Sequence, residues 1–265
     1  TVEADGLVDG VVSNWAACHF DPKKLRCPGG ADAGDACLSD PQLAVIESLT
    51  SPIETPGGRM EPGYFLSGTE TRPGAWDSYL FGAPSRYERF SGSFVRDFLA
   101  KDSTVDPFTY GLNEHPREFD AFYELQEATP HLRAFLERGK LILWTGAGDP
   151  SSPPATIVNY YNAVVDEVGG RAEADASVRF YMLGGVGHCG GGVGADRVDA
   201  LLPALDAWAT KNKPPKNLVA TKLDPKTGDM VLSRPLCSYP DYPRYRGSGD
   251  PNEARSFTCV KSTGR

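Results

Sequence analysis

The sequence predicts an α/β protein, because strand-like and helix-like patterns alternate along its C-terminal half. The apolar run that follows Gly139 and the aromatic-rich, alternating run Val178–Leu183 each have the length of a buried strand, and glycines end both. Helical patterns follow them over Pro153–Val168 and Asp196–Thr210. Strands that alternate with helices are typical of the α/β class.

The N-terminal stretch is rich in residues typical of turns and has few periodic apolar positions. Asp5 and Asp9, interspersed with glycines, offer the hard oxygen ligands that calcium prefers, with a solvated acidic turn as the alternative. Residues 14–39 are rich in cysteine, proline and glycine and have few periodic apolar positions. We therefore expect disulfides, more than a hydrophobic core, to stabilise them. The next stretch, up to Leu49, predicts a helix with Asp40 as its N-cap and a proline at the first helical position.

Residues 50–88 return to Pro-Gly turns, and a long irregular segment of this kind usually forms a lid or a binding loop. Aromatic residues gather there, and they either contact a substrate or form the segment's own small core. The candidates for substrate contact are Trp76, Phe90 and Phe94. Candidate partners for a substrate carboxylate are Arg86, Arg89 and Arg96, although a surface ion pair is the commoner fate of arginine. A weaker helix pattern spans 106–128.

Two loops after the predicted strands carry the candidate chemistry. Thr129–Gly139 predicts a helix that leads into the first strand, and Asp149 stands just beyond the glycines that end that strand. His188 stands in the glycine-rich loop after the second strand. Histidine both takes and gives a proton near neutrality, and α/β folds place such groups at the carboxyl ends of strands. The alternative is a loop histidine satisfied by backbone groups.

The order strand, acid, helix, strand, base, helix is the order in which the last two members of an α/β-hydrolase triad arrive. On that interpretation Asp149 orients the imidazole and His188 withdraws the proton of a nucleophile. No G-x-S-x-G motif is present, and Ser91 and Ser93 belong to a helix start. We therefore expect the serine on residues that precede Thr1 or on a separate chain.

The end of the chain predicts a last packing helix and a tail. Helix 196–210 places apolar residues on one face, with Trp208 in the core and a kink at Pro203. Residues 211–265 predict a surface-wrapping tail that contains two short extended runs, Val231–Cys237 and Phe257–Val260.

Composition excludes several classes of function. The formal net charge of -8 and the sequence pI of about 5.1 argue against nucleic-acid binding and against binding to an anionic membrane surface. No apolar run is long enough to span a bilayer, and the first residues do not form a signal peptide. The six cysteines lack the paired C-x-x-C spacing of a zinc site, so disulfides and a secreted or periplasmic location are favoured.

These features together resemble the tannase and feruloyl esterase family, which includes the mono(2-hydroxyethyl) terephthalate hydrolases. The matching pieces are Asp149, Gly187-His188-Cys189, the acidic loop from Asp5 to Val11 and the cysteines after it. The resemblance covers nearly the whole chain. It implies the C-terminal half of an α/β-hydrolase fold with a disulfide-stapled lid domain inserted before it. The lid domain with its calcium loop would span 1–128, and the catalytic half 129–265.

The resemblance also assigns residues. Asp149 becomes the triad acid, His188 the base, and Cys189 the half-cystine that bonds a cysteine beside the upstream serine. Local spacing and the resemblance together favour two further disulfides, Cys27 with Cys37 and Cys237 with Cys259. The partner of Cys18 is uncertain, because Thr1 stands where the family's calcium loop usually opens with a cysteine.

For the acidic loop the resemblance implies a structural calcium ion. Its ligands would be the carboxylates of Asp5 and Asp9 and the main-chain carbonyls of Leu7 and Val11. Val2 stands where the family has its first aspartate, which should weaken binding.

The function that follows is a serine esterase acting on aromatic esters of the feruloyl, galloyl or terephthalate type. This chain would supply the acid, the base and the lid, and the N-terminal half of the same hydrolase would supply the serine and the cysteine for Cys189. Two rival hypotheses are a non-catalytic fragment and a calcium-binding subunit on a hydrolase scaffold.

Overall fold

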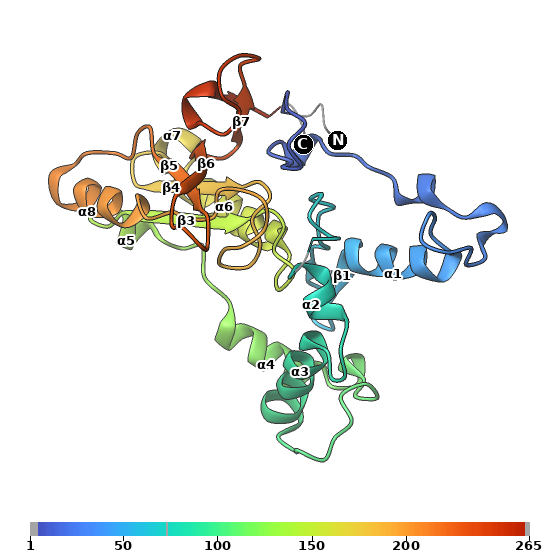
Figure 1. The fold of residues 1–265 in the computed structure, drawn as a ribbon. Coiled ribbons are helices and arrows are strands. Elements are labelled where there is room, and N and C mark those ends of the chain that lie inside the picture. Colours follow the sequence, from blue (N-terminus) through green and yellow to red (C-terminus); the bar gives the residue numbers. More distant parts are fainter. Residues whose placement is uncertain (1–4, 73, 263–265) are drawn as a thin grey trace.

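The computed structural model describes residues 5–72 and 74–262. Its centre is a pair of parallel strands, β3 (Leu141–Gly146) and β4 (Val178–Leu183), linked by helix α6 (Pro154–Val168) and the short helix α7 (Arg171–Ala174) (Figure 1). Leu141 pairs with Val178 and Gly146 with Leu183, so the two strands end at the same edge. This is the strand-helix-strand order that the sequence predicts.

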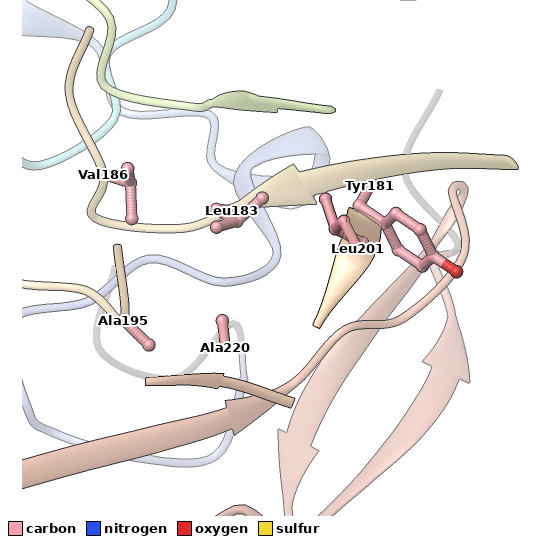
Figure 2. Packing of buried hydrophobic residues seen from close by; sticks show 6 residues of the cluster. All are labelled: Tyr181, Leu183, Val186, Ala195, Leu201 and Ala220. Atoms are coloured by element: carbon pink, nitrogen blue, oxygen red, sulfur yellow. The ribbon is translucent and has the colours of Figure 1, made fainter. Parts of the chain in front are cut away.

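Two clusters of buried side chains hold this unit together. One joins β4 and the loop after it to helix α8 (Leu201–Lys211) and strand β5 (Val219–Leu223) (Figure 2); its members are Tyr181, Leu183, Val186, Ala195, Leu201 and Ala220. The other packs α6 on β4 and consists of Val158, Tyr161, Val164, Val178 and Phe180. Trp208 of α8 is buried, as the sequence predicts. Strand β3 differs from β4, because only its last residue is fully buried.

The C-terminal tail forms two antiparallel strand pairs. Strand β5 pairs with β6 (Met230–Pro235), and β7 (Asp241–Tyr245) pairs with β8 (Phe257–Lys261), which follows the short helix η6 (Ala254–Ser256). The two predicted extended runs correspond to β6 and β8. A disulfide joins Cys237 to Cys259. Tyr239 donates its main-chain N–H to the Phe180 carbonyl, so the tail is tied to β4.

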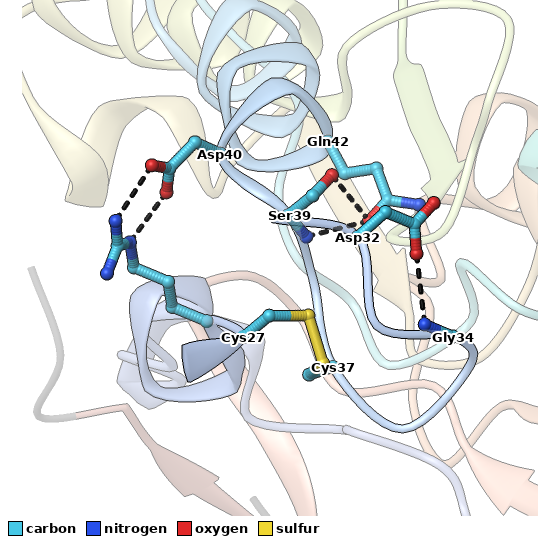
Figure 3. The surroundings of a disulfide bond; sticks show 8 residues. Cys27, Asp32, Gly34, Cys37, Ser39, Asp40 and Gln42 are labelled. Atoms are coloured by element: carbon cyan, nitrogen blue, oxygen red, sulfur yellow. Dashed lines mark hydrogen bonds and ion pairs between the residues drawn. A yellow bond between two sulfur atoms is a disulfide. The ribbon is translucent and has the colours of Figure 1, made fainter. Parts of the chain in front are cut away.

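The N-terminal region begins with short 3₁₀ turns and then enters helix α1 (Asp40–Thr50); the turns are η1 (Trp15–Ala17), η2 (Pro22–Leu25) and η3 (Pro28–Gly30). The predicted Cys27–Cys37 disulfide is present beside the start of α1 (Figure 3). The predicted cap of α1 is wrong by one residue. Ser39 is the N-cap, and Gln42 accepts its main-chain N–H. Asp40 instead pairs with the guanidinium of Arg26 at 2.6 Å.

After the small strand pair β1 (Ile53–Glu54) and β2 (Met60–Glu61), the chain forms a helical lobe, residues 76–126 (Figure 1). Its elements are α2 (Trp76–Leu80), α3 (Arg86–Ser93), the π-helix η4 (Phe94–Ala100), η5 (Leu112–Glu114) and α4 (Pro116–Gln126). The helix predicted over 106–128 therefore forms only over α4, which begins at Pro116. The rings of Phe94 and Phe122 meet edge to face with centroids 4.8 Å apart, which joins η4 to α4.

Two further helix predictions need correction at their starts. The predicted helix from Thr129 is confined to α5 (Arg133–Leu136), because the Thr129 hydroxyl accepts the His131 N–H in a turn of its own. Helix α8 begins five residues later than predicted, because Arg197 forms a β-bridge with Thr221. Pro203 therefore falls in the first turn of α8, where its missing N–H costs no helical hydrogen bond.

Candidate active site

The predicted acid and base meet at the shared edge of β3 and β4. His188 Nδ1 lies 2.9 Å from Asp149 Oδ2. The loops that carry them are joined by main-chain hydrogen bonds, because Gly148 donates its N–H to the Val186 carbonyl. A Cβ on Gly146 would lie only 2.2 Å from that carbonyl oxygen, so glycine is required for the two loops to approach this closely.

The Asp149 carboxylate has one defined orientation. It is 8 % exposed, and its Oδ1 accepts the main-chain N–H groups of Ser151 at 2.7 Å and Ser152 at 3.2 Å. These bonds leave Oδ2 for the imidazole. Because a carboxylate only accepts hydrogen bonds, Nδ1 carries the hydrogen and Nε2 of His188 is left to accept a proton.

The base stands on a loop whose backbone only glycine adopts easily. Gly190, Gly191 and Gly192 all have positive φ, and Cys189 has a φ of 56°. Two side chains that sequence reasoning missed hold this loop. Asp196 accepts the Gly191 N–H at 2.8 Å, and Lys222 donates to the Gly192 carbonyl at 2.8 Å. Lys222 belongs to β5, which is far from His188 in the sequence. No local pattern therefore predicts that it contacts the histidine loop.

A cavity of about 180 Å³ adjoins His188. One wall is the glycine loop and Pro150, and the other comes from the segment that leads into and includes the helical lobe. The side chains that line this second wall are Thr69, Arg72, Tyr79 and Arg86. Among the described residues neither arginine pairs with a carboxylate, and the Arg86 guanidinium lies 5.3 Å from the centroid of the Tyr79 ring.

The three rings predicted to contact a substrate lie elsewhere. Phe94 packs inside the helical lobe, Phe90 is 61 % exposed, and Trp76 meets Tyr64 edge to face at 6.2 Å. None of the three is among the residues that line the cavity. The ring that does line it, Tyr79, belongs to the same aromatic-rich stretch, but composition alone does not separate it from its neighbours.

Two cysteines form no disulfide within the described residues. Cys18 is half-buried, and Cys189, directly after the base, is exposed.

The acidic loop is tied to the C-terminal tail. Asp5 is 4 % exposed and accepts the N–H of Ser13 at 2.8 Å, and burial raises its pKa. Asp9 accepts the N–H of Val11 at 2.9 Å and pairs with Arg234 of β6 at 2.7 Å. Burial lowers the pKa of the Arg234 guanidinium, and its bond to Asp9 opposes that shift.

The oxygen donors of this loop fit calcium in kind. Two carboxylates and the carbonyls of Leu7 and Val11 are the mixed set that the ion accepts. The loop offers less negative charge to a cation than two free carboxylates would, because Asp9 already forms an ion pair with Arg234. Within 5–72 and 74–262 no three acidic, histidine or cysteine side chains form a metal-binding group, and Val2 lies outside the described residues.

A parallel strand pair with an acid and a base on the loops at one edge is consistent with the part of an α/β-hydrolase fold that carries the last two triad members. Comparison with known proteins gives the family. The family model for tannase and feruloyl esterase matches residues 2–260, so the chain belongs to that family of carboxylic ester hydrolases.

Individual relatives agree with this membership, and a solved structure shares the fold. A probable feruloyl esterase of Arthroderma benhamiae is 32 % identical over 281 residues, covering 98 % of this chain and 50 % of that protein. A mono(2-hydroxyethyl) terephthalate hydrolase of Piscinibacter sakaiensis is 29 % identical over 301 residues, covering 97 % and 49 %. The crystal structure of feruloyl esterase B from Aspergillus oryzae superposes with a TM-score of 0.80 at 23 % identity, covering 97 % and 53 %. The chain thus spans about half the length of the relatives it matches.

Proposed function

We propose that this chain supplies the acid and the base of a serine esterase that cleaves esters of aromatic acids. The observation that carries the proposal is the 2.9 Å contact between Asp149 and His188, on an imidazole that lines a cavity. Relatives named as feruloyl esterases and as a terephthalate half-ester hydrolase support an aromatic acyl group.

The nucleophilic serine would come from residues outside this chain, upstream of it or on a separate polypeptide. Strand β3 supports this, because five of its six residues remain partly exposed in a sheet whose described part has two strands. Parallel sheets are normally covered on both faces. The partial exposure of β3 is therefore what we expect of a sheet that further elements would complete. The chain matches about half the length of the relatives, which leaves room in a protein of that length for a segment that carries the serine.

The mechanism follows from the geometry of the pair. His188 Nε2 takes the proton of the serine hydroxyl as its oxygen attacks the ester carbon, and Asp149 holds the imidazolium through Nδ1. The imidazolium then gives that proton to the leaving alcohol. In the second half-reaction His188 takes a proton from the water that attacks the acyl carbon, and it gives this proton to the serine oxygen as the bond to the acyl group breaks and the aromatic acid leaves. The oxyanion donors would lie near the serine.

Residues 1–128 would form the lid over the acyl part of the substrate. Tyr79 and Arg86 of the helical lobe face the base across the cavity, which supports this role. Tyr79 offers a ring for stacking. Arg72 and Arg86, which have no carboxylate partner among the described residues, favour an acyl group that carries a carboxylate. Trp76, Phe90 and Phe94 remain predictions from sequence.

The test is hydrolysis by the full-length protein of three esters: chlorogenate, a galloyl ester and mono(2-hydroxyethyl) terephthalate. His188→Ala should abolish turnover, and His131→Ala, a change at an exposed histidine on the surface, should not. The arginines predict that the terephthalate half-ester is the best of the three. Unchanged turnover in His188→Ala would refute the proposed mechanism. No turnover of any ester by the wild type would favour a non-catalytic or calcium-binding scaffold.

We also propose that the acidic loop binds one structural calcium ion, through Asp5 and Asp9 side chains and Leu7 and Val11 carbonyls. Calcium should raise the melting temperature of the wild type, and Asp9→Asn should remove this effect. Asp224→Asn is the matched control, because Asp224 likewise accepts the N–H two residues ahead of it. If calcium changes the melting temperature of the wild type and of Asp9→Asn by the same amount, or changes neither, the acidic loop is not the calcium site.

Two formed disulfides support a secreted or periplasmic protein. In the part of the chain that the structure describes, no helix combines the length and apolar character needed to cross a bilayer. Exposed Cys189 would bond a cysteine beside the serine, and the partner of Cys18 is left open. Peptide mapping without reduction should find Cys189 linked to a peptide from outside this chain. Native Cys189 that reacts with a thiol reagent would contradict this pairing.

A further inference from the structure

The loop that carries the acid is held by a tyrosine of the helical lobe. Tyr87, in α3, donates its hydroxyl hydrogen to the carbonyl of Pro150, the residue directly after Asp149. The two residues are 63 positions apart in the sequence. Strand β3 ends at Gly146, so the chain beyond it needs other contacts to fix where Asp149 points.

A second tyrosine stands behind the first. The hydroxyl of Tyr64 interacts with that of Tyr87. Burial raises the pKa of both tyrosines, and the Asp149 charge adds to the effect in each. Both hydroxyls therefore keep their protons at any pH at which the protein works.

The other side of the acid is also in contact with the N-terminal region. Thr69 and Ser67 are buried, share a 2.6 Å hydrogen bond between their hydroxyls, and pack directly on Gly148. Asp149 thus lies between two residues, Gly148 and Pro150, that segments ahead of β3 hold in place.

We propose that Tyr87 is a positioning residue for the triad: by holding the Pro150 carbonyl it keeps Asp149 Oδ2 within hydrogen-bonding distance of His188 Nδ1. The proposal rests on the proposed function, because it concerns the same acid and base. It makes docking of the helical lobe a condition for correct acid geometry. A displacement of about 1 Å at a catalytic group can cost on the order of 100-fold in rate.

The test uses Tyr87→Phe in the full-length protein, since phenylalanine keeps the ring that packs 5.4 Å from the Tyr79 ring and loses only the hydroxyl. We expect kcat to fall roughly 10- to 100-fold with KM nearly unchanged. The far-downfield proton resonance of His188 Nδ1–H, a signature of its bond to Asp149, should broaden or disappear. Tyr64→Phe, which removes the hydroxyl next to that of Tyr87, should change both readouts in the same direction by less.

Tyr160→Phe is the matched control, because the Tyr160 hydroxyl also donates to a main-chain carbonyl, that of Thr129, away from the site. It should change neither kcat nor the resonance, and melting temperatures of all variants measure the purely structural cost. If Tyr87→Phe keeps the resonance and the wild-type kcat, the positioning role is refuted. If Asp149→Asn keeps both as well, the proposed function itself fails, so the two failures are distinguishable.

Discussion

Gly148→Ala should destabilise the protein through one identifiable contact. An ideal Cβ at this position would lie 2.3 Å from Thr69 Oγ1, 3.1 Å from Thr69 Cγ2 and 3.2 Å from Ser67 Oγ. Thr69 is 4 % exposed and its hydroxyl is bonded to Ser67, so it has little room to withdraw. Overpacking of this size costs about 1–3 kcal/mol in the free energy of unfolding.

The reasoning is tested by a double-mutant cycle with Thr69→Ala. That substitution removes both Thr69 atoms that clash and costs about 1 kcal/mol by itself, for the lost hydrogen bond. If the clash is the cause, the double variant should be more stable than the sum of the single changes predicts, by about 1–2 kcal/mol. Urea denaturation of the four proteins gives each free energy of unfolding.

Gly92→Ala is the control for a glycine-to-alanine change. It lies in α3, where the nearest atom to a new Cβ is the end of the Arg96 side chain at 2.9 Å, which can move. Alanine is the better helix former, so this variant should equal or slightly exceed the wild type in stability. Strictly additive effects of Gly148→Ala and Thr69→Ala would show that the Gly148 contact is not as described.

Three further outcomes are expected. Asp149→Asn in the full-length esterase should lower kcat roughly 10⁴-fold, because an amide favours the wrong imidazole tautomer; steady-state kinetics that show less than a tenfold loss would contradict the assigned role. Removing the Cys237–Cys259 disulfide by a double alanine substitution should cost about 3 kcal/mol in urea denaturation, since the cysteines are 22 residues apart. Arg234→Met should cost about 2–3 kcal/mol, below the figure for a fully buried pair because Asp9 is 23 % exposed. In that last case a matching loss in Asp9→Asn, with no further loss in the double variant, would attribute the cost to the pair.

The acid and base could be predicted from sequence because their positions follow from local patterns. Each residue stands just after a glycine-ended strand, and two parallel strands joined by a helix must end at one edge. The disulfides Cys27–Cys37 and Cys237–Cys259 were accessible from spacing together with family resemblance.

Other features could not be read from local patterns. The start of α8 is displaced because Arg197 bonds Thr221, a residue in a later strand. Asp40 has the chemistry of an N-cap, but the distant Arg26 takes its carboxylate. Of many rings in one stretch, Tyr79 lines the cavity because of how the lobe packs, and no periodicity encodes that. The sequence therefore predicts that Asp149 and His188 meet more successfully than it predicts which residues surround them.

The hydrogen bonds that orient Asp149 and His188 do not involve a nucleophile. The buried carboxylate would be costly without partners, and two main-chain N–H groups of its own loop satisfy Oδ1. Oδ2 then has one partner, the imidazole, whose loop is fixed by Asp196 and Lys222. Every bond in this set lies within one chain. The pair is therefore preorganised by the bonds of this chain, and under the proposed function a serine would meet an imidazole that is already oriented.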